Sequence, residues 1–118
     1  MAEDIQGLVL RDLFVSAMTI KQYDWQPFRA GVEIHQLYGG DAGQPAAALL
    51  RYAPGASVPR HVHEGYEHIL ILSGEQSDER GSYPAGTLLV SAPGSAHSVS
   101  SKTGCVVLAI WQLPVRFS

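Results

Sequence analysis

The sequence predicts an all-β fold, a sandwich or a barrel formed by a single domain. Twelve glycines and seven prolines divide the 118 residues into short segments. These segments are rich in β-branched and aliphatic residues, and no long amphipathic helical pattern is sustained. Short apolar runs bounded by turn residues are typical of antiparallel strands. A chain of this length buries well over half of its unfolded surface on folding, so it can support a core of its own.

The strands are expected to lie between turns that contain proline or glycine, such as Pro54-Gly55 and Pro93-Gly94. Residues 25–118 are expected to form the barrel, and residues 1–24 a flanking strand or arm. A polar hairpin tip is expected at residues 78–81. The expected strands are Phe14–Thr19, Val32–Tyr38, Ala46–Tyr52, Ser57–His63, His68–Ser73, Glu75–Ser77, Thr87–Ser91, His97–Ser100 and Cys105–Leu113.

Composition and charge exclude several classes of protein. The formal net charge of −3 gives no support to nucleic acid or an anionic membrane surface as a partner. No apolar run approaches the roughly 20 residues that span a bilayer, and the acidic N-terminal segment does not resemble a signal peptide. The lone cysteine, Cys105, has no partner for a disulfide within the chain. We therefore expect a cytoplasmic protein that binds neither nucleic acid nor a membrane.

The stretch from Gly55 to Gly74 carries a pattern of metal ligands. His61 and His63 alternate on one expected strand, so both side chains point to the same face. Glu67 returns on the neighbouring strand, and His97 reaches the same place from a later one. Imidazole nitrogens and a carboxylate oxygen suit a divalent ion of the first transition row. The sequence therefore predicts one metal site at His61, His63, Glu67 and His97, with zinc or iron favoured over manganese or nickel.

At these residues the sequence resembles the cupin family. The first cupin motif is matched at Gly55, His61, His63, Glu67 and Gly74, and the second at Gly86, Gly94 and His97. Ala92 and Ser101 stand where the family usually has proline and often has asparagine. The resemblance implies a double-stranded β-helix, or jelly-roll, barrel.

A narrower resemblance is to the cupin-like domain of ChrR-type anti-sigma factors. It is carried by Trp25–Pro27, Pro54–His63, Ser73–Thr87, Pro93–His97 and Gly104-Cys105. This resemblance implies a metal, often zinc, on the three histidines and the glutamate. Some dioxygenases that cleave carbon–carbon bonds are also similar in this region.

Three hypotheses of function follow. The domain is a dioxygenase-like enzyme with Fe(II), in which Glu67 is the candidate catalytic proton acceptor, or it is a module that responds to a small ligand or an oxidant. The alternative is a ChrR-like zinc-binding regulatory domain without its sigma-binding part. A homodimer, paired through Val106–Trp111 as an edge strand, is compatible with each of them.

Other polar residues have a structural interpretation beside a functional one. Arg51, Tyr66 and Tyr83 are candidates for a substrate pocket, although a surface ion pair for Arg51 and rim packing for the tyrosines are the simpler interpretations. His68 directly follows Glu67 and is expected on the opposite face. His35 is expected to have a structural or pocket-lining role.

Overall fold

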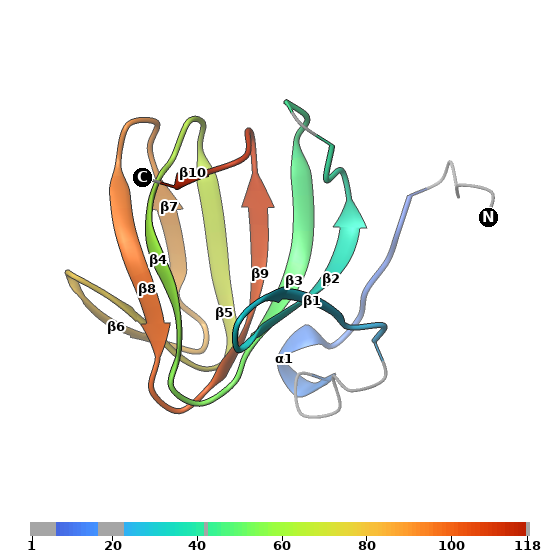
Figure 1. The fold of residues 1–118 in the computed structure, drawn as a ribbon. Helices are drawn as coiled ribbons and strands as arrows, with labels where there is room; N and C mark the ends of the chain where they lie inside the picture. The colour runs from blue at the N-terminus through green and yellow to red at the C-terminus, as the bar shows by residue number, and fades with distance from the viewer. Residues whose placement is uncertain (1–6, 17–22, 42, 118) are drawn as a thin grey trace.

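The expected strands form one strongly curved antiparallel sheet. The structure is a computed structural model, and it describes residues 7–16, 23–41 and 43–117. In Figure 1, β4 and β8 lie at one side of the curve, β2 and β3 at the other, and β5 and β9 between them. The elements are α1 (Leu13–Ser16), β1 (Gln26–Arg29), β2 (Val32–Tyr38), β3 (Ala46–Tyr52), β4 (Ala56–Val62), β5 (Glu67–Asp78), β6 (Gly81–Pro84), β7 (Leu88–Ser91), β8 (Ala96–Ser101), β9 (Cys105–Trp111) and β10 (Arg116–Phe117).

Strand β5 joins the two halves of the barrel. The strand order is β1-β2-β3-β9-β5-β8-β4-β10, and β6 and β7 also pair with β5. The first half of β5 pairs with β9 and β7, and the second half of β5 pairs with β6 and β8. The register with β9 shifts between Ile71 and Ser73, next to Gly74. Gly74 has a φ of 73°, and a Cβ there would lie 2.1 Å from the Gly104 carbonyl oxygen. Only glycine fits this approach, so Gly74 permits the bend at which β5 passes between the halves.

The two faces of the sheet carry separate apolar clusters. The inner face holds the main hydrophobic core, which includes Leu50, Ile69, Ile71 and Val107. On the outer face a smaller cluster of Leu49, Leu72 and Val106 is covered by side chains of the N-terminal region: Leu13, Tyr23 and Trp25. Alternation along the strands separates these two sets, and the polar site described below lies on the inner side. No helix among the described residues is long and apolar enough to cross a membrane.

Three expectations about the strands need correction. A strand was expected at Phe14–Thr19, but residues 13–16 form a short helix and residues 17–19 lie outside the described part of the chain. Leu13, at the start of this helix, packs against the apolar cluster on the outer face. The expected edge strand Val106–Trp111 is interior, because β9 pairs with β3 on one side and β5 on the other. The strands β1, β6 and β10 were not expected, and each is four residues or shorter.

Candidate metal centre

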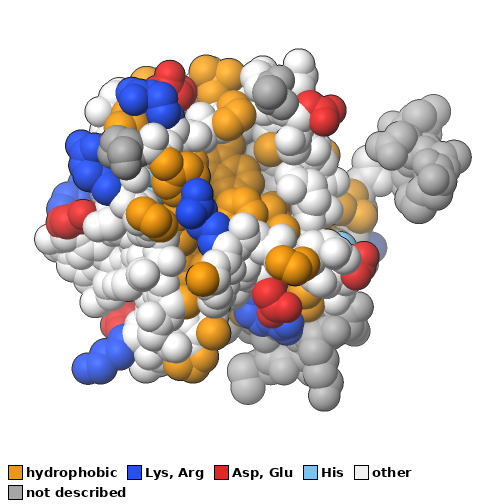
Figure 2. Space-filling view, in the orientation of Figure 1, with side chains coloured by type: hydrophobic (Ala, Val, Ile, Leu, Met, Phe, Trp, Pro, Cys, Tyr) orange, Lys and Arg blue, Asp and Glu red, His pale blue; other side chains and the backbone are white. Residues whose placement is uncertain are grey.

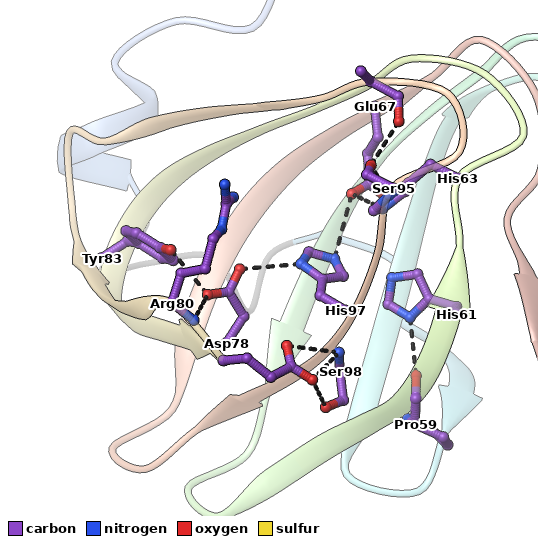
Figure 3. Close-up of polar contacts among 12 residues, drawn as sticks. Pro59, His61, His63, Glu67, Asp78, Arg80, Tyr83, Ser95, His97 and Ser98 are labelled. Atoms are coloured by element: carbon purple, nitrogen blue, oxygen red, sulfur yellow. Dashed lines mark hydrogen bonds and ion pairs between the residues drawn. The ribbon is translucent and has the colours of Figure 1, made fainter.

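The structure brings the four predicted ligands together inside the barrel. His61 lies on β4, His63 just after it, Glu67 at the start of β5 and His97 on β8. His61 and His97 are directly opposite each other in the β4–β8 register. All four residues are buried, with exposed fractions of 2–8%. One ligand atom from each lies within 4.8 Å of the others. Figure 3 shows the rings of His61, His63 and His97 close to one another, with Glu67 beside His63.

The size of this cluster suits a transition-metal ion. Zinc binds histidine nitrogen at about 2.0–2.1 Å, so donors on opposite sides of an ion lie about 4.2 Å apart at most. The observed maximum of 4.8 Å is slightly larger. An inward shift of a few tenths of an ångström at each side chain is therefore enough to close the cluster around one ion.

The outer nitrogens of His61 and His63 are held by oxygen atoms around the cluster. His61 Nδ1 lies 2.9 Å from the Pro59 carbonyl oxygen, and His63 Nδ1 lies 2.9 Å from Ser95 Oγ. Ser95 uses its own hydroxyl hydrogen on the Ala92 carbonyl, at 2.6 Å. Both oxygens therefore accept, and Nδ1 donates in each histidine. Nε2 of each histidine therefore faces the centre of the site and is the nitrogen available to a metal ion once it carries no proton.

His97 is held in the same way by a carboxylate. Its Nδ1 lies 3.1 Å from Asp78 Oδ2, and the side chain of Asp78 is 1% exposed. Burial raises the pKa of the Asp78 carboxyl, but hydrogen bonds from the Arg80 amide, the Tyr83 hydroxyl and His97 outweigh it and lower the pKa overall. His97 Nε2 is buried and has no hydrogen-bond partner among the described residues. A buried nitrogen that is oriented yet unpaired is the donor that a bound cation would satisfy.

Glu67 completes the donor set and is itself oriented by a tryptophan. Its Oε1 lies 3.0 Å from His63 Nε2 and 4.0 Å from His97 Nε2, while Oε2 accepts a hydrogen bond from Trp111 Nε1 at 2.7 Å. Burial raises the pKa of Glu67, but the hydrogen bond and charge of His63 and the hydrogen bond of Trp111 lower it overall. Burial lowers the pKa of His61, and its hydrogen bond to Pro59 offsets this only in part. The lowered pKa of Glu67 favours its carboxylate and that of His61 its neutral imidazole, and these are the forms that bind a divalent metal.

A small chamber lies beside the ligands. Its volume is about 40 Å³, and its wall includes His61, Glu67, His97, Tyr52 and Gln76. A space of this size holds a water-sized molecule. The donor set, the inward lone pairs and the unpaired His97 nitrogen together fit a single divalent ion with this chamber at its side.

Sequence analysis missed the residues that support the ligands. Asp78 was assigned to a hairpin tip, Trp111 to an expected edge strand, and Ser95 had no assigned role. These contacts join residues that lie 19–44 positions apart, such as Asp78 with His97 and Glu67 with Trp111. No local pattern marks such pairs. The remaining signal is that Asp78 and Ser95 lie within or beside a strand that carries a ligand, whereas Trp111 lies on β9, opposite Glu67 in the register.

The residues proposed for a substrate pocket lie elsewhere. Arg51 is on the face of β3 opposite Leu50 and Tyr52, where it binds Glu33 at 2.6 Å and lies over the Trp25 ring. Tyr66 is 49% exposed at the corner before β5. Tyr83 donates a hydrogen bond to Asp78, at 2.9 Å. None of Arg51, Tyr66 and Tyr83 lines the chamber among the described residues.

Two other histidines were expected outside the site. His68 is half-buried and pairs with Val90 and Ile110 in the register of the sheet. His35 contacts the Asp24 carbonyl oxygen through Nδ1, at 3.1 Å, and packs against Tyr23. Neither belongs to the cluster of potential metal ligands.

A curled antiparallel barrel with an internal site of three histidines and one glutamate, at this motif spacing, defines a cupin domain. Within that class, the chain belongs to the ChrR cupin-like domain family, whose model matches residues 15–114.

Known proteins similar to this chain include ChrR and an acetylacetone dioxygenase. The chain is 32% identical over 96 residues to the anti-sigma-E factor ChrR of Cereibacter sphaeroides, and this match covers 80% of the chain and 44% of that relative. A chain in the crystal structure of Rhodobacter sphaeroides SigE in complex with the anti-sigma ChrR has a TM-score of 0.70 and 29% identity, covering 78% of this chain and 51% of that one. An acetylacetone dioxygenase from Acinetobacter johnsonii has a TM-score of 0.74 over 99% of this chain and 78% of its own. At 16% identity, this last likeness shows the fold alone.

Proposed function

We propose that the domain holds one divalent transition metal at His61, His63, Glu67 and His97 and responds to a small ligand or an oxidant at that site. The observation that carries this proposal is the orientation of the histidines. Oxygen acceptors hold each Nδ1, so each Nε2 is directed inward, and that of His97 has no partner among the described residues.

The donor set favours zinc or iron over calcium or magnesium. Imidazole nitrogens suit the first-row transition metals, whereas calcium and magnesium prefer oxygen ligands. When bound, such an ion supplies Lewis-acid chemistry, and iron adds reactivity toward dioxygen. The chain supplies the rest: it orients the donors, excludes bulk water and leaves a chamber about 40 Å³ in volume beside the ion.

Metal analysis of protein purified without chelators tests this function. The expected result is about one zinc or iron ion per chain, because four preoriented donors bind such ions tightly. Removing the ion should lower the melting temperature, since an ion that binds only the folded state stabilises it. A chain that takes up neither ion from excess zinc or Fe(II) at neutral pH would contradict the proposal.

A dioxygenase-like enzyme is the second candidate. The chamber touches His61, Glu67 and His97, so a molecule the size of water or dioxygen can lie beside the ion and the Glu67 carboxylate. The expected result is oxygen uptake by Fe(II)-loaded protein with acetylacetone or a hydroxylated aromatic ketone, and none by the zinc-loaded control. Iron-loaded protein that consumes no oxygen with any of these compounds leaves the responsive module as the better proposal.

The similarity to ChrR supports a regulatory setting. The relative is named an anti-sigma-E factor, and the chain spans 44% of its length. On this basis we propose that the metal site controls a partner protein, with zinc as the ion. Copurification from cells with and without a chelator tests this: a sigma factor recovered in one condition and lost in the other supports it, and no such difference argues against it.

We also propose a homodimer formed through the outer face of the sheet. Val90, His68 and Ile110 lie side by side on β7, β5 and β9, with Leu88 nearby. Leu88, Val90 and Ile110 are 56%, 53% and 38% exposed. An exposed apolar patch of this kind is typical of an interface. Light scattering should show a dimer that Val90→Lys converts to a monomer, and a monomeric wild type rejects this arrangement.

A further inference from the structure

Gln76 is a buried polar side chain in the chamber that a metal ion does not account for. It lies on β5 and is 2% exposed, and its Oε1 has no hydrogen-bond partner among the described residues. Among the described residues, the other buried side-chain atom without a hydrogen-bond partner is His97 Nε2, which belongs to the metal cluster. A buried amide oxygen without a donor is unfavourable until something donates to it. Gln76 Oε1 therefore requires a donor that the described side chains do not supply.

A larger apolar cavity adjoins this chamber. Its volume is about 260 Å³, and Phe28, Trp111, Val115 and Phe117 form walls of both spaces. Figure 2 shows hydrophobic side chains gathered in a hollow near the middle of one face of the molecule. The cavity is mainly apolar and the chamber behind these shared walls is polar, so a ligand that reaches both would meet an apolar body and a polar inner end.

The polar groups at the mouth of the cavity argue against a negatively charged ligand. They are the amides of Gln36 and Gln44 and the carboxylate of Asp41, and all three residues are exposed. The Gln36 amide nitrogen already donates to the carbonyl oxygens of Tyr38 and Ala47. No lysine or arginine lines the cavity among the described residues, and Arg29 lies over the Phe117 ring, 3.7 Å from its centroid, so Asp41 is the charge that an anion would meet at the mouth.

We infer that this space binds a neutral, mainly apolar small molecule that carries a hydroxyl group. The hydroxyl donates to Gln76 Oε1 in the chamber, and the apolar part occupies the cavity between Phe28 and Trp111. A pocket with apolar walls and one or two placed polar groups is the usual form of a small-molecule site. The inference extends the ligand-responsive function proposed above and rests on it for the ion, whereas Gln76 and the cavity belong to the protein alone.

Trp111 connects this ligand site to the metal site. Its ring lines both spaces, and its indole nitrogen donates to Glu67 Oε2 at 2.7 Å. A ligand in the cavity therefore contacts the residue that orients a metal ligand. This contact gives a route by which occupancy of the cavity alters the metal site, and it makes Trp111 fluorescence a direct readout of binding.

The test compares three probes of similar shape on the full chain. These are 4-ethylphenol, ethylbenzene, which lacks the hydroxyl group, and 4-ethylbenzoate, which carries a negative charge. Calorimetry and Trp111 fluorescence, the latter in a Trp25→Phe background, measure the dissociation constants. We expect 4-ethylphenol to bind about tenfold more tightly than ethylbenzene, since one hydrogen bond separates them. The anion should bind most weakly.

Two variants assign the hydroxyl contact to Gln76. Gln76→Met keeps a similar length without the amide oxygen, and Gln76→Leu is a second apolar replacement. Each should weaken 4-ethylphenol binding about tenfold and leave ethylbenzene binding unchanged. Gln26→Met is the matched control, because Gln26 is an exposed amide that bonds to Asp24, and it should change neither constant.

The outcomes separate this inference from the proposed metal function. Wild-type protein that binds neither phenol nor hydrocarbon, or binds both equally, overturns the inference. If chelation alone abolishes the preference for the phenol, the ion and not Gln76 holds the hydroxyl, and the inference fails while the metal function stands. If a chain shown to bind no ion keeps the preference, and Gln76→Met removes it, the inference stands while the metal function fails.

Discussion

The histidines inside the barrel and His35 outside it show how one side chain takes two roles. His61, His63 and His97 are buried, and their ring centroids lie 4.8–5.2 Å apart. His35 is half-buried on the outer face and packs against the Tyr23 ring, at a centroid distance of 5.0 Å. All four have Nδ1 within hydrogen-bond distance of an oxygen atom.

The inner histidines differ from His35 because their side chains converge on one point. Inside the barrel the free nitrogens share one small space with the Glu67 carboxylate, whereas His35 faces aromatic rings. The nearest acidic side chain on its strand, Glu33, is already bound to Arg51. A fixed tautomer prepares a ligand, but several donors directed at one point make a metal site.

Replacing one histidine from each region should produce the largest difference in metal content between two variants. We expect His63→Ala to reduce metal content from about one ion per chain to less than about a tenth, because it removes a donor from a four-donor site. His35→Ala should retain the ion. Elemental analysis of both variants, purified side by side, measures the difference. Full occupancy in His63→Ala would refute the ligand assignment.

Acid should act on the inner histidines in a defined direction. Because burial lowers the pKa of His61, the unfolded chain takes up a proton near the ordinary value of 6.5 that the folded chain resists. The free energy of unfolding of the metal-free protein should therefore fall as pH drops below 6.5. The lowered pKa of Glu67 acts in the same direction at lower pH, since its stabilisation is lost only when that carboxylate is protonated.

Urea denaturation of chelated protein at pH 7.5 and pH 5.5 measures this effect. His61→Gln should reduce the loss of stability between the two pH values, because glutamine does not titrate. Equal losses in the wild type and in His61→Gln would show that His61 does not contribute.

Removing Asp78, which holds His97, should weaken metal binding less than removing a ligand does. It should weaken metal binding more than removing the hydroxyl that holds Asp78 itself. Asp78→Ala should weaken metal binding about 10- to 100-fold, the usual effect of removing the partner of a metal-bound histidine. Tyr83→Phe, which removes only the hydrogen bond to Asp78, should change affinity by less than about threefold. Competition with a chromophoric chelator measures both. Wild-type metal affinity in Asp78→Ala would show that Asp78 does not support the metal site.

The smallest effect is expected on the outer face. Arg51 pairs with Glu33 and lies 4.6 Å from the centroid of the Trp25 ring, with its side chain 31% exposed. Arg51→Gln should lower the free energy of unfolding by about 1 kcal/mol or less, as is usual for exposed contacts. It should not change the binding of metal or of the phenol probe. A clear loss of metal binding or of phenol binding would show that Arg51 contributes to the ligand site.

The strands and the ligands were predictable to different depths. Strands such as β2 and β3 were predicted at the residues where they occur, because alternation and flanking turns mark them locally. The short helix at Leu13–Ser16 and the edge strands β1 and β10 were not, because tertiary packing rather than local preference forms such short elements. Similarly, β9 looks like any exposed apolar strand in sequence, and only closure of the barrel places it between β3 and β5.

The sequence by itself determined the all-β class and the identity of the four candidate ligands, since period-two spacing and turn chemistry act over a few residues. Tertiary structure alone decided which oxygens orient those ligands, where Trp111 meets Glu67, and that Gln76 is left with an unpaired oxygen beside an apolar cavity. These features depend on the curvature of the sheet, which brings together residues that are far apart in the chain. No local pattern specifies that curvature, because it results from the packing of all the strands at once.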